Sequence, residues 1–160
     1  MSRNAKLIAS LVMLSLAGLL AFNFFRTHRD PVPLAYFYDL SERKLFTAPQ
    51  DSVPPIVGTD GKIEDAVRAV VYSPSGDCER DQKIAYLEKY SSELKKQFEA
   101  AKAAPAQEIP RMSRGAAQLH TFVCRVGETN WFASNTQEAD IMIDEWRTAH
   151  PGKNPTICIP

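Results

Sequence analysis

The sequence predicts an α+β domain, with an antiparallel sheet of about five or six strands and two main helices on one face, preceded by a transmembrane helix. Three observations support this prediction. An uncharged apolar run occupies residues 7–25. Short runs of β-branched and aromatic residues, bounded by turn residues, indicate strands. Two longer segments repeat apolar residues every three to four positions, which is typical of amphipathic helices.

The apolar run at residues 7–25 is long enough to cross a bilayer. Nineteen residues rise about 28 Å as an α-helix, close to the thickness of the hydrocarbon core. Arg3 and Lys6 precede the run, Arg26 and Arg29 follow it, and no charge lies within it. The run is longer than the apolar core of a secretory signal, and no Ala-x-Ala site follows it. The sequence therefore favours an uncleaved signal anchor over a cleaved signal peptide or a buried helix.

This anchor divides the chain into four parts. Residues 1–6 form a short tail, residues 7–25 the anchor, residues 26–33 a proline-containing juxtamembrane spacer, and residues 34–160 a single extracytoplasmic domain. The Lys and Arg counts beside the run are equal, so the positive-inside rule alone does not decide the orientation. Because the tail is very short, we expect a single-pass protein with a cytoplasmic N-terminus and an exported domain, periplasmic if the protein is bacterial.

The composition of residues 31–160 limits the partners of the domain. These residues carry 15 Lys or Arg and 18 Asp or Glu, a formal charge of −3. A mildly acidic domain lacks the basic surface that nucleic-acid binding requires. About 130 residues suffice for one domain with a real core but not for two. We therefore expect the bilayer, through Leu7 to Phe25, and a protein as partners, and no nucleic acid.

The strand predictions follow the β-branched and aromatic runs. The clearest strand covers residues 66–72, because it is rich in valine and ends abruptly at Ser73-Pro74. Turn residues between the other runs predict two hairpins. These strands are residues 34–40 and 45–48, then 118–126 and 131–133, with a short terminal strand at 156–159.

Two segments have helical periodicity. Apolar residues from Ile84 to Ala101 recur at three to four positions, which predicts a helix over about 81–104 with Asp81 as its N-cap; a break at Ser91-Ser92 would give two shorter helices. The second helix covers residues 137–149, with Asn135 or Thr136 as its N-cap. Residues 105–115 between them are linker-like.

Three cysteines leave one thiol unpaired whichever two are joined. Cys124 and Cys158 both lie in strand-like runs, so the sequence favours a disulfide between them and leaves Cys78 as the free thiol. A thiolate at Cys78 would gain from the predicted helix N-terminus, but three neighbouring acids oppose it. A structural or exposed thiol is therefore favoured over a reactive one.

No catalytic, cofactor-binding or metal-ligating set is predicted. The acids from Asp77 to Glu88 match part of a calcium-loop count, but Gln82 stands where that loop requires glycine. His120 and Cys124 would lie about 13 Å apart on one strand, too far to share a zinc ion. The P-loop, Rossmann and Gly-x-Ser-x-Gly fingerprints are absent from the sequence.

Aromatic residues offer a candidate binding platform. They form two clusters, Tyr36-Phe37-Tyr38 and Trp131-Phe132. Because alternate residues of a strand point to opposite faces, half of them must point inward, and core packing is the favoured interpretation.

An apolar N-terminal helix followed by an α+β head resembles the architecture of type IV pilins and pseudopilins. The sequence departs from their pattern, because Lys6 meets Leu7 directly and no acid lies within the apolar run. The predicted function is a membrane-tethered, non-enzymatic extracytoplasmic interaction or assembly subunit. The alternatives are a thiol/redox or other small enzyme module that uses Cys78, and a pilin-like assembly subunit.

Overall fold

The computed structural model describes residues 12–20, 22, 32–104 and 112–160. The chain divides into two compact units, Met1–Val32 and Pro33–Pro160. In the first unit, residues 12–20 and 22 are helical and exposed. Among the described residues, no helix has both the length and the hydropathy needed to span a membrane. The tail, the rest of the predicted anchor and most of the spacer lie outside the described residues, so their assignments stay predictions.

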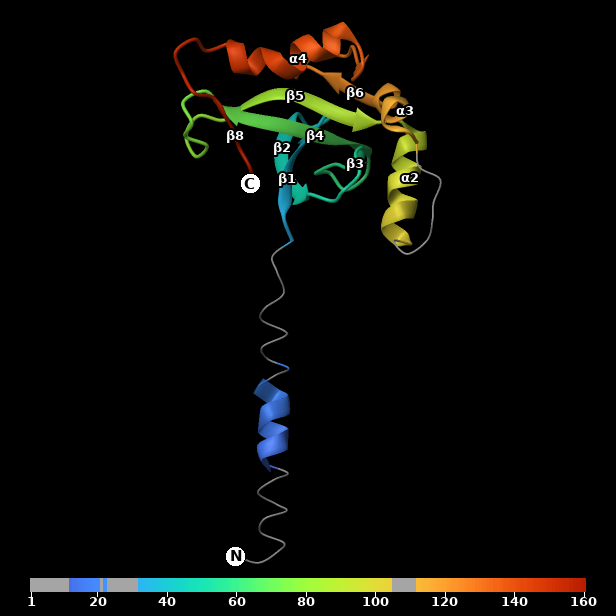
Figure 1. Cartoon of the computed structure of the whole chain (residues 1–160), viewed down its shortest axis with the longest axis vertical. Coiled ribbons are helices and arrows are strands. Elements are labelled where there is room, and N and C mark those ends of the chain that lie inside the picture. Colours follow the sequence, from blue (N-terminus) through green and yellow to red (C-terminus); the bar gives the residue numbers. More distant parts are fainter. Residues whose placement is uncertain (1–11, 21, 23–31, 105–111) are drawn as a thin grey trace, which may run out of the picture. The chain divides into compact units, whose positions relative to one another are not determined.

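The second unit is built on an antiparallel sheet with the strand order β2-β1-β4-β5-β6-β7 (Figure 1). Two short strands, β3 and β8, also pair with β4, which makes eight strands in the described part of the chain. The α+β class is confirmed, with more strands than the five or six expected. The strands are β1 (Leu34–Asp39), β2 (Lys44–Pro49), β3 (Ile56–Val57), β4 (Glu64–Ser73), β5 (Lys83–Tyr90), β6 (Thr121–Cys124), β7 (Phe132–Ala133) and β8 (Thr156–Ile157).

Three helices accompany the sheet in the described residues of this unit: α2 (Ser92–Ala103), α3 (Arg114–Leu119) and α4 (Gln137–Thr148). Figure 1 shows α4 lying across the sheet over β5 and β6, while α2 follows the end of β5. Each helix begins at a hydroxyl N-cap, because Ser91, Ser113 and Thr136 each accept a hydrogen bond from a backbone N–H of the first turn.

The two hairpins, the strand at residues 66–72 and the helix at residues 137–149 are confirmed, with shifted ends. The predicted helix over residues 81–104 is wrong in its first half, where β5 forms, and α2 begins only after the Ser91 N-cap. The apolar spacing in this segment imitates a helix because β5 contains a bulge. Val70 and Val71 of β4 pair with Tyr86 and Ile84, which leaves Ala85 as an extra residue.

The bulge in β5 places Ile84 and Leu87, three residues apart, on the same core cluster. That spacing imitates a helical repeat. The linker predicted over residues 105–115 ends earlier, because α3 begins at Arg114, while residues 105–111 lie outside the described residues. The strand predicted over 118–126 is shorter, because β6 begins only at Thr121.

The main core lies against β4 and β5. Its buried members are Val67, Ala69, Val71, Leu87 and Cys158. Partly buried aromatic residues from distant segments pack against this cluster, among them Tyr38 of β1 and Trp131 before β7. The core therefore joins the first hairpin to the segment between β6 and β7, which is the arrangement on which the candidate site depends.

Candidate functional site

A cavity of about 500 Å³ lies between the first hairpin and the β6–β7 connection. The hairpin contributes one aromatic, one aliphatic and one basic side chain, and the connection contributes a tryptophan and an acid. The lining residues are Tyr38, Leu40, Arg43, Val126, Gly127, Glu128, Thr129 and Trp131. We call this set the hairpin cavity. A cavity lined by apolar side chains and a few charged groups is typical of binding sites.

Asp39 fixes the hairpin turn that carries Arg43 into the cavity wall. Its carboxylate is buried and accepts hydrogen bonds from the backbone N–H groups of Glu42 (2.9 Å) and Thr59 (2.6 Å) and from the hydroxyls of Ser41 and Thr59. These bonds, the Glu42 N–H above all, lower the pKa of Asp39 to about 2. A side chain at residue 58 would collide with this carboxylate, so glycine there leaves the room that the hydrogen-bonded carboxylate occupies.

Arg43 ends this turn in a left-handed backbone conformation, with φ of 53°. Such a conformation is unfavourable for a residue with a Cβ atom and suits glycine better. The arginine side chain is nevertheless exposed at the cavity. The turn therefore keeps a cationic side chain at a position where the backbone alone would favour glycine.

Trp131 forms the aromatic wall opposite the hairpin. The Nζ atom of Lys89, on β5, lies 4.0 Å from the centre of the Trp131 ring. A lysine at this distance stabilises the ring by a cation–π interaction and fixes its orientation. Burial lowers the pKa of Lys89. On the neighbouring strand β6, Lys89 pairs with Phe122 and Leu87 pairs with Cys124, so β5 positions both the tryptophan and the start of the loop that precedes it.

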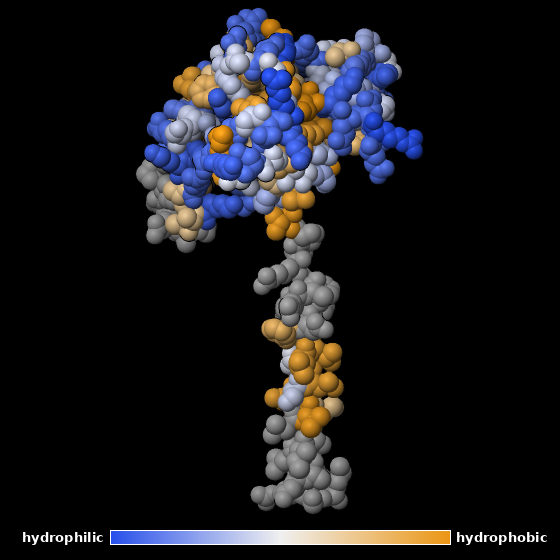
Figure 2. Space-filling view, turned by 180° about the vertical axis from the view of Figure 1, so that it is seen from behind, coloured by the Kyte–Doolittle hydropathy of each residue, from blue (hydrophilic) through white to orange (hydrophobic). Residues whose placement is uncertain are grey.

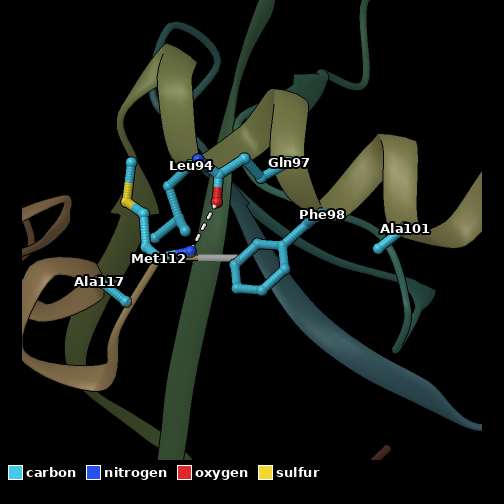
Figure 3. A pocket seen from close by; sticks show the side chains of 6 residues that line it. All are labelled: Leu94, Gln97, Phe98, Ala101, Met112 and Ala117. Atoms are coloured by element: carbon cyan, nitrogen blue, oxygen red, sulfur yellow. Dashed lines mark hydrogen bonds between the residues drawn. The ribbon is translucent and has the colours of Figure 1, made fainter. Parts of the chain in front are cut away.

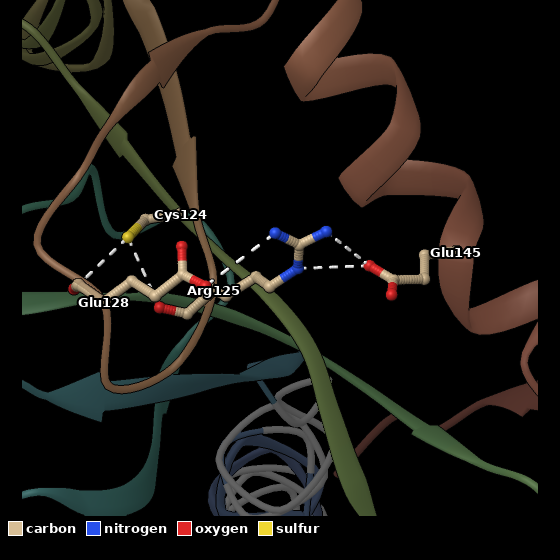
Figure 4. Close-up of polar contacts among 4 residues, drawn as sticks. All are labelled: Cys124, Arg125, Glu128 and Glu145. Carbon is tan, nitrogen blue, oxygen red and sulfur yellow. Dashed lines mark hydrogen bonds and ion pairs between the residues drawn. The ribbon is translucent and has the colours of Figure 1, made fainter.

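The β6–β7 connection is held at its base by the thiol of Cys124 and the guanidinium of Arg125, whose contacts Figure 4 shows. The Cys124 thiol donates to the carbonyl oxygens of Arg125 (3.3 Å) and Glu128 (3.4 Å). The Arg125 guanidinium donates to the Glu145 carboxylate on α4 at 2.7 and 3.1 Å. Gly127 turns the chain with φ of 84°. One face of the connection therefore stays fixed while Val126, Glu128 and Thr129 remain exposed.

The predicted disulfide is wrong in its partner. Cys158 is bonded to Cys78, not to Cys124, and Cys124 is the free thiol. Cys124 lies on β6 opposite Leu87, whereas β8 pairs with the end of β4, beside the loop that contains Cys78. Burial raises the pKa of the Cys124 thiol, so it stays protonated and acts as a hydrogen-bond donor.

The other residues considered for chemistry lie apart from one another. His120 Nδ1 lies 2.8 Å from the hydroxyl of Ser91 at the start of α2, which fits a role in capping and packing. Within the described ranges, no three His, Cys, Asp or Glu side chains are grouped to hold a metal ion. The Asp77 carboxylate accepts from the Glu79 N–H and forms a surface ion pair with Arg80.

A second pocket of about 330 Å³ lies between α2 and the segment that leads into α3 (Figure 3). Its side chains are mostly apolar and come from Leu94, Gln97, Phe98, Ala101, Met112 and Ala117. The Met112 N–H donates to Gln97 Oε1 at 3.1 Å. None of the described side chains that line this pocket is charged, so the hairpin cavity is the better candidate.

The sequence identified part of the hairpin cavity. Tyr38 and Trp131 belong to the two predicted aromatic clusters, and the cavity brings them together, while Phe37 points away and is fully buried. Arg43, Glu128 and Lys89 were missed. Arg43 and Glu128 are turn residues with no periodic pattern, and only the pairing of β1 with β4 and of β5 with β6 shows that the two turns are neighbours.

The fold and the site together define a small disulfide-bonded α+β domain with an amphipathic cavity beside its first hairpin. The sequence matches no protein-family model, no curated protein and no solved structure.

Proposed function

We propose that this protein is a membrane-tethered, non-enzymatic subunit whose exported α+β domain binds another protein through the hairpin cavity. The main support for the membrane tether is the helix at residues 12–20 and 22. Every one of these residues is exposed, and none is charged (Figure 2). Its large apolar side chains are Val12, Met13, Leu14, Leu16, Leu19, Leu20 and Phe22. Apolar side chains on every side of a helix suit a lipid environment.

The disulfide supports export of the domain. Cys78 and Cys158 are 80 residues apart in sequence, and the bond joins the loop after β4 to the segment after β8. Disulfides persist in oxidising compartments and are rare in the cytosol. An exported domain with a cytoplasmic tail is therefore the orientation that we propose.

Protein binding is proposed because of the composition of the hairpin cavity. Tryptophan, tyrosine and arginine are the residues that contribute most often to binding energy in interfaces. Trp131, Tyr38 and Arg43 meet here, and Glu128 adds an opposite charge. We propose a partner that inserts an apolar or aromatic side chain between Tyr38 and Trp131 and forms charge pairs at the rim.

The redox alternative has less support. Cys78 is already bonded, its partner Cys158 is only 4% exposed, and the remaining thiol of Cys124 is buried. A thiol that attacks a substrate must be accessible and deprotonated. The pilin-like alternative depends only on the order of an apolar helix and an α+β domain.

We expect the full chain to resist carbonate extraction from membranes. Replacing Leu16 and Leu19 together by arginine should release it, because each arginine in the middle of a membrane helix costs about 2.5–3.5 kcal/mol. The measurement is the fraction in the carbonate supernatant. Ile141→Arg, at an exposed position on α4, is the matched control and should stay in the membrane pellet. Release of the unmodified chain would contradict the tether.

We expect a photocrosslinker at Thr129 to capture a protein in intact membranes. Arg43→Gly should lower the yield of that adduct by about tenfold or more, as loss of a hot-spot arginine costs roughly 2 kcal/mol. Glycine suits the left-handed backbone at residue 43, so the fold should be retained. Arg80→Gly, at an exposed arginine in the loop after β4, is the control. Equal yields in the two variants would exclude the cavity as the binding site.

A further inference from the structure

β2 is the end strand of the sheet path β2-β1-β4-β5-β6-β7, and it pairs with β1 along its whole length. The Gln50 N–H donates to the Pro33 carbonyl at 2.8 Å, which continues this pairing one residue beyond the strand. The N–H and C=O groups of successive residues alternate between the two edges of an antiparallel strand. The even-numbered residues of β2 therefore bond to β1, and Leu45 and Thr47 point their backbone groups toward the outer edge.

The outer edge of β2 has unpaired backbone groups. Within the ranges that the structure describes, the outward N–H and C=O groups of Leu45 and Thr47 form no hydrogen bond. A strand edge of this kind is a template for a further strand. Lys and Pro commonly protect such edges, but Lys44 and Pro49 stand only at the two ends of β2, and the residues between them carry no charge. The middle of the edge is therefore open to pairing.

A second copy of β2 matches this edge. A twofold axis perpendicular to the sheet makes the two strands antiparallel and keeps equivalent side chains on the same face. Pro49 has no N–H, and its carbonyl already accepts from the Ser52 N–H at 2.9 Å. The register that uses every outward N–H therefore places Leu45 of each copy opposite Thr47 of the other. Phe46 then lies at the twofold axis.

The side chains agree with this register. Leu45 packs on the core cluster, so Phe46 points to the opposite face, where its ring lies 6.1 Å from the ring of Phe37. The two Phe46 side chains would meet across the axis, and aromatic cross-strand pairs stabilise a sheet.

The charges at the two ends of β2 are complementary. Arg43 precedes the strand, Asp51 follows it, and both side chains are exposed. Antiparallel pairing brings Arg43 of one copy to a diagonal position from Asp51 of the other, within reach of a long side chain. Asp51 also forms an ion pair with Lys102, yet its side chain stays 61% exposed and can accept a second partner. This match favours a second copy over an unrelated strand.

We propose that the outer edge of β2 is a homodimer interface, at which two copies of the chain join their sheets antiparallel through Leu45 and Thr47. The contact is isologous, so it closes on itself and gives a dimer rather than a filament. The proposal depends neither on the membrane tether nor on the hairpin cavity.

The test uses the full chain in detergent, with micelles in excess over chains and p-benzoylphenylalanine in place of Phe46. Irradiation should give adducts of two chains in roughly tenfold excess over the same probe at Ile141, because only residue 46 lies at the proposed axis. Ile141 is an exposed position on α4 and serves as the matched control. Folding is checked by counting one free thiol under non-reducing denaturation. If the Phe46 variant fails this check, Lys44 carries the probe.

Two substitutions at Thr47, each combined with the probe, separate strand pairing from other contacts. Thr47→Pro removes the outward N–H but no bond to β1, and proline is tolerated on an edge strand when its nitrogen faces away from the ladder. Each copy loses a pairing hydrogen bond, so the adducts should fall about tenfold. Thr47→Val keeps the N–H and should leave the yield unchanged.

Each outcome supports or overturns the dimer. An excess of two-chain adducts at residue 46 that is lost in Thr47→Pro and kept in Thr47→Val supports it. Equal yields at residues 46 and 141, equal yields in the proline and valine variants, or no two-chain adducts in chains that pass the thiol count overturn it. The hairpin cavity is tested separately, by capture at Thr129.

Discussion

Replacing Cys78 by serine should lower the free energy of unfolding of the domain by about 4 kcal/mol. The bond that is lost closes a loop across a sequence separation of 80 residues. In the chain-entropy description, releasing a loop of this size gives the unfolded state about 4.5 kcal/mol of additional stability at 25 °C. Cys78 is the better position to change, because its partner Cys158 lies in the core. The measurement is urea unfolding of the full chain in detergent, followed by the fluorescence of Trp131 and Trp146.

A reductant provides the control for this prediction. It should destabilise the unmodified chain by the same amount and leave Cys78→Ser unchanged. Cys124→Ala, which removes the buried free thiol without breaking the disulfide, should keep its sensitivity to reductant. An unmodified chain whose unfolding midpoint ignores the reductant would show that the bond contributes nothing to stability.

Replacing Asp39 by alanine should lower the free energy of unfolding by about 3 kcal/mol. The substitution leaves the N–H groups of Glu42 and Thr59 without their acceptor, and each lost bond to a charged group costs about 1.5–3 kcal/mol, partly recovered by water. Asp60→Ala is the matched control, because Asp60 also accepts from two backbone N–H groups but is exposed. Its loss should cost less than about 1 kcal/mol. Equal losses of unfolding free energy in Asp39→Ala and Asp60→Ala would show that the burial of Asp39 does not increase its contribution to stability.

The same carboxylate should make the domain sensitive to acid. The pKa of Asp39 in the folded state is about 2, below its usual value, chiefly because the Glu42 N–H bonds the ionised form. A lowered pKa contributes stability above the unfolded pKa of about 4 and loses it as the pH falls toward 2. Unfolding midpoints from pH 7 to pH 2.5 should therefore fall less steeply in Asp39→Asn. Identical acid slopes would show that Asp39 carries none of this dependence.

Prediction from sequence succeeded where the local pattern and the tertiary packing agree. The valine-rich strand at residues 66–72 is central in the sheet and buries side chains on both faces, Val67 and Val71 on one and Ala66 and Tyr72 on the other. The helix at residues 137–149 buries Ala139 and Met142 on one stripe and begins at the hydroxyl of Thr136, as its pattern indicates. The first hairpin forms because its polar turn separates two aromatic strands.

The errors have a common origin in contacts between segments that are distant in sequence. Ile84 and Leu87 have helical spacing, but pairing with β4 and β6 makes this segment a strand, and the bulge at Ala85 accounts for the spacing. Cys124 was paired with Cys158 because both lie in strands, yet strand order places Cys158 beside Cys78. Periodicity reports which face of an element is buried, not which element covers it.

By itself, the sequence determined the α+β class, the hairpins, the hydroxyl-capped helix and an apolar N-terminal run without charge. Only the tertiary structure decided which cysteines pair, where β5 replaces a helix, and that Arg43, Glu128 and Trp131 line one cavity. The physical reason is that propensity and capping act within a few residues along the chain. Disulfides, strand neighbours and cavities depend on how the sheet brings distant turns together.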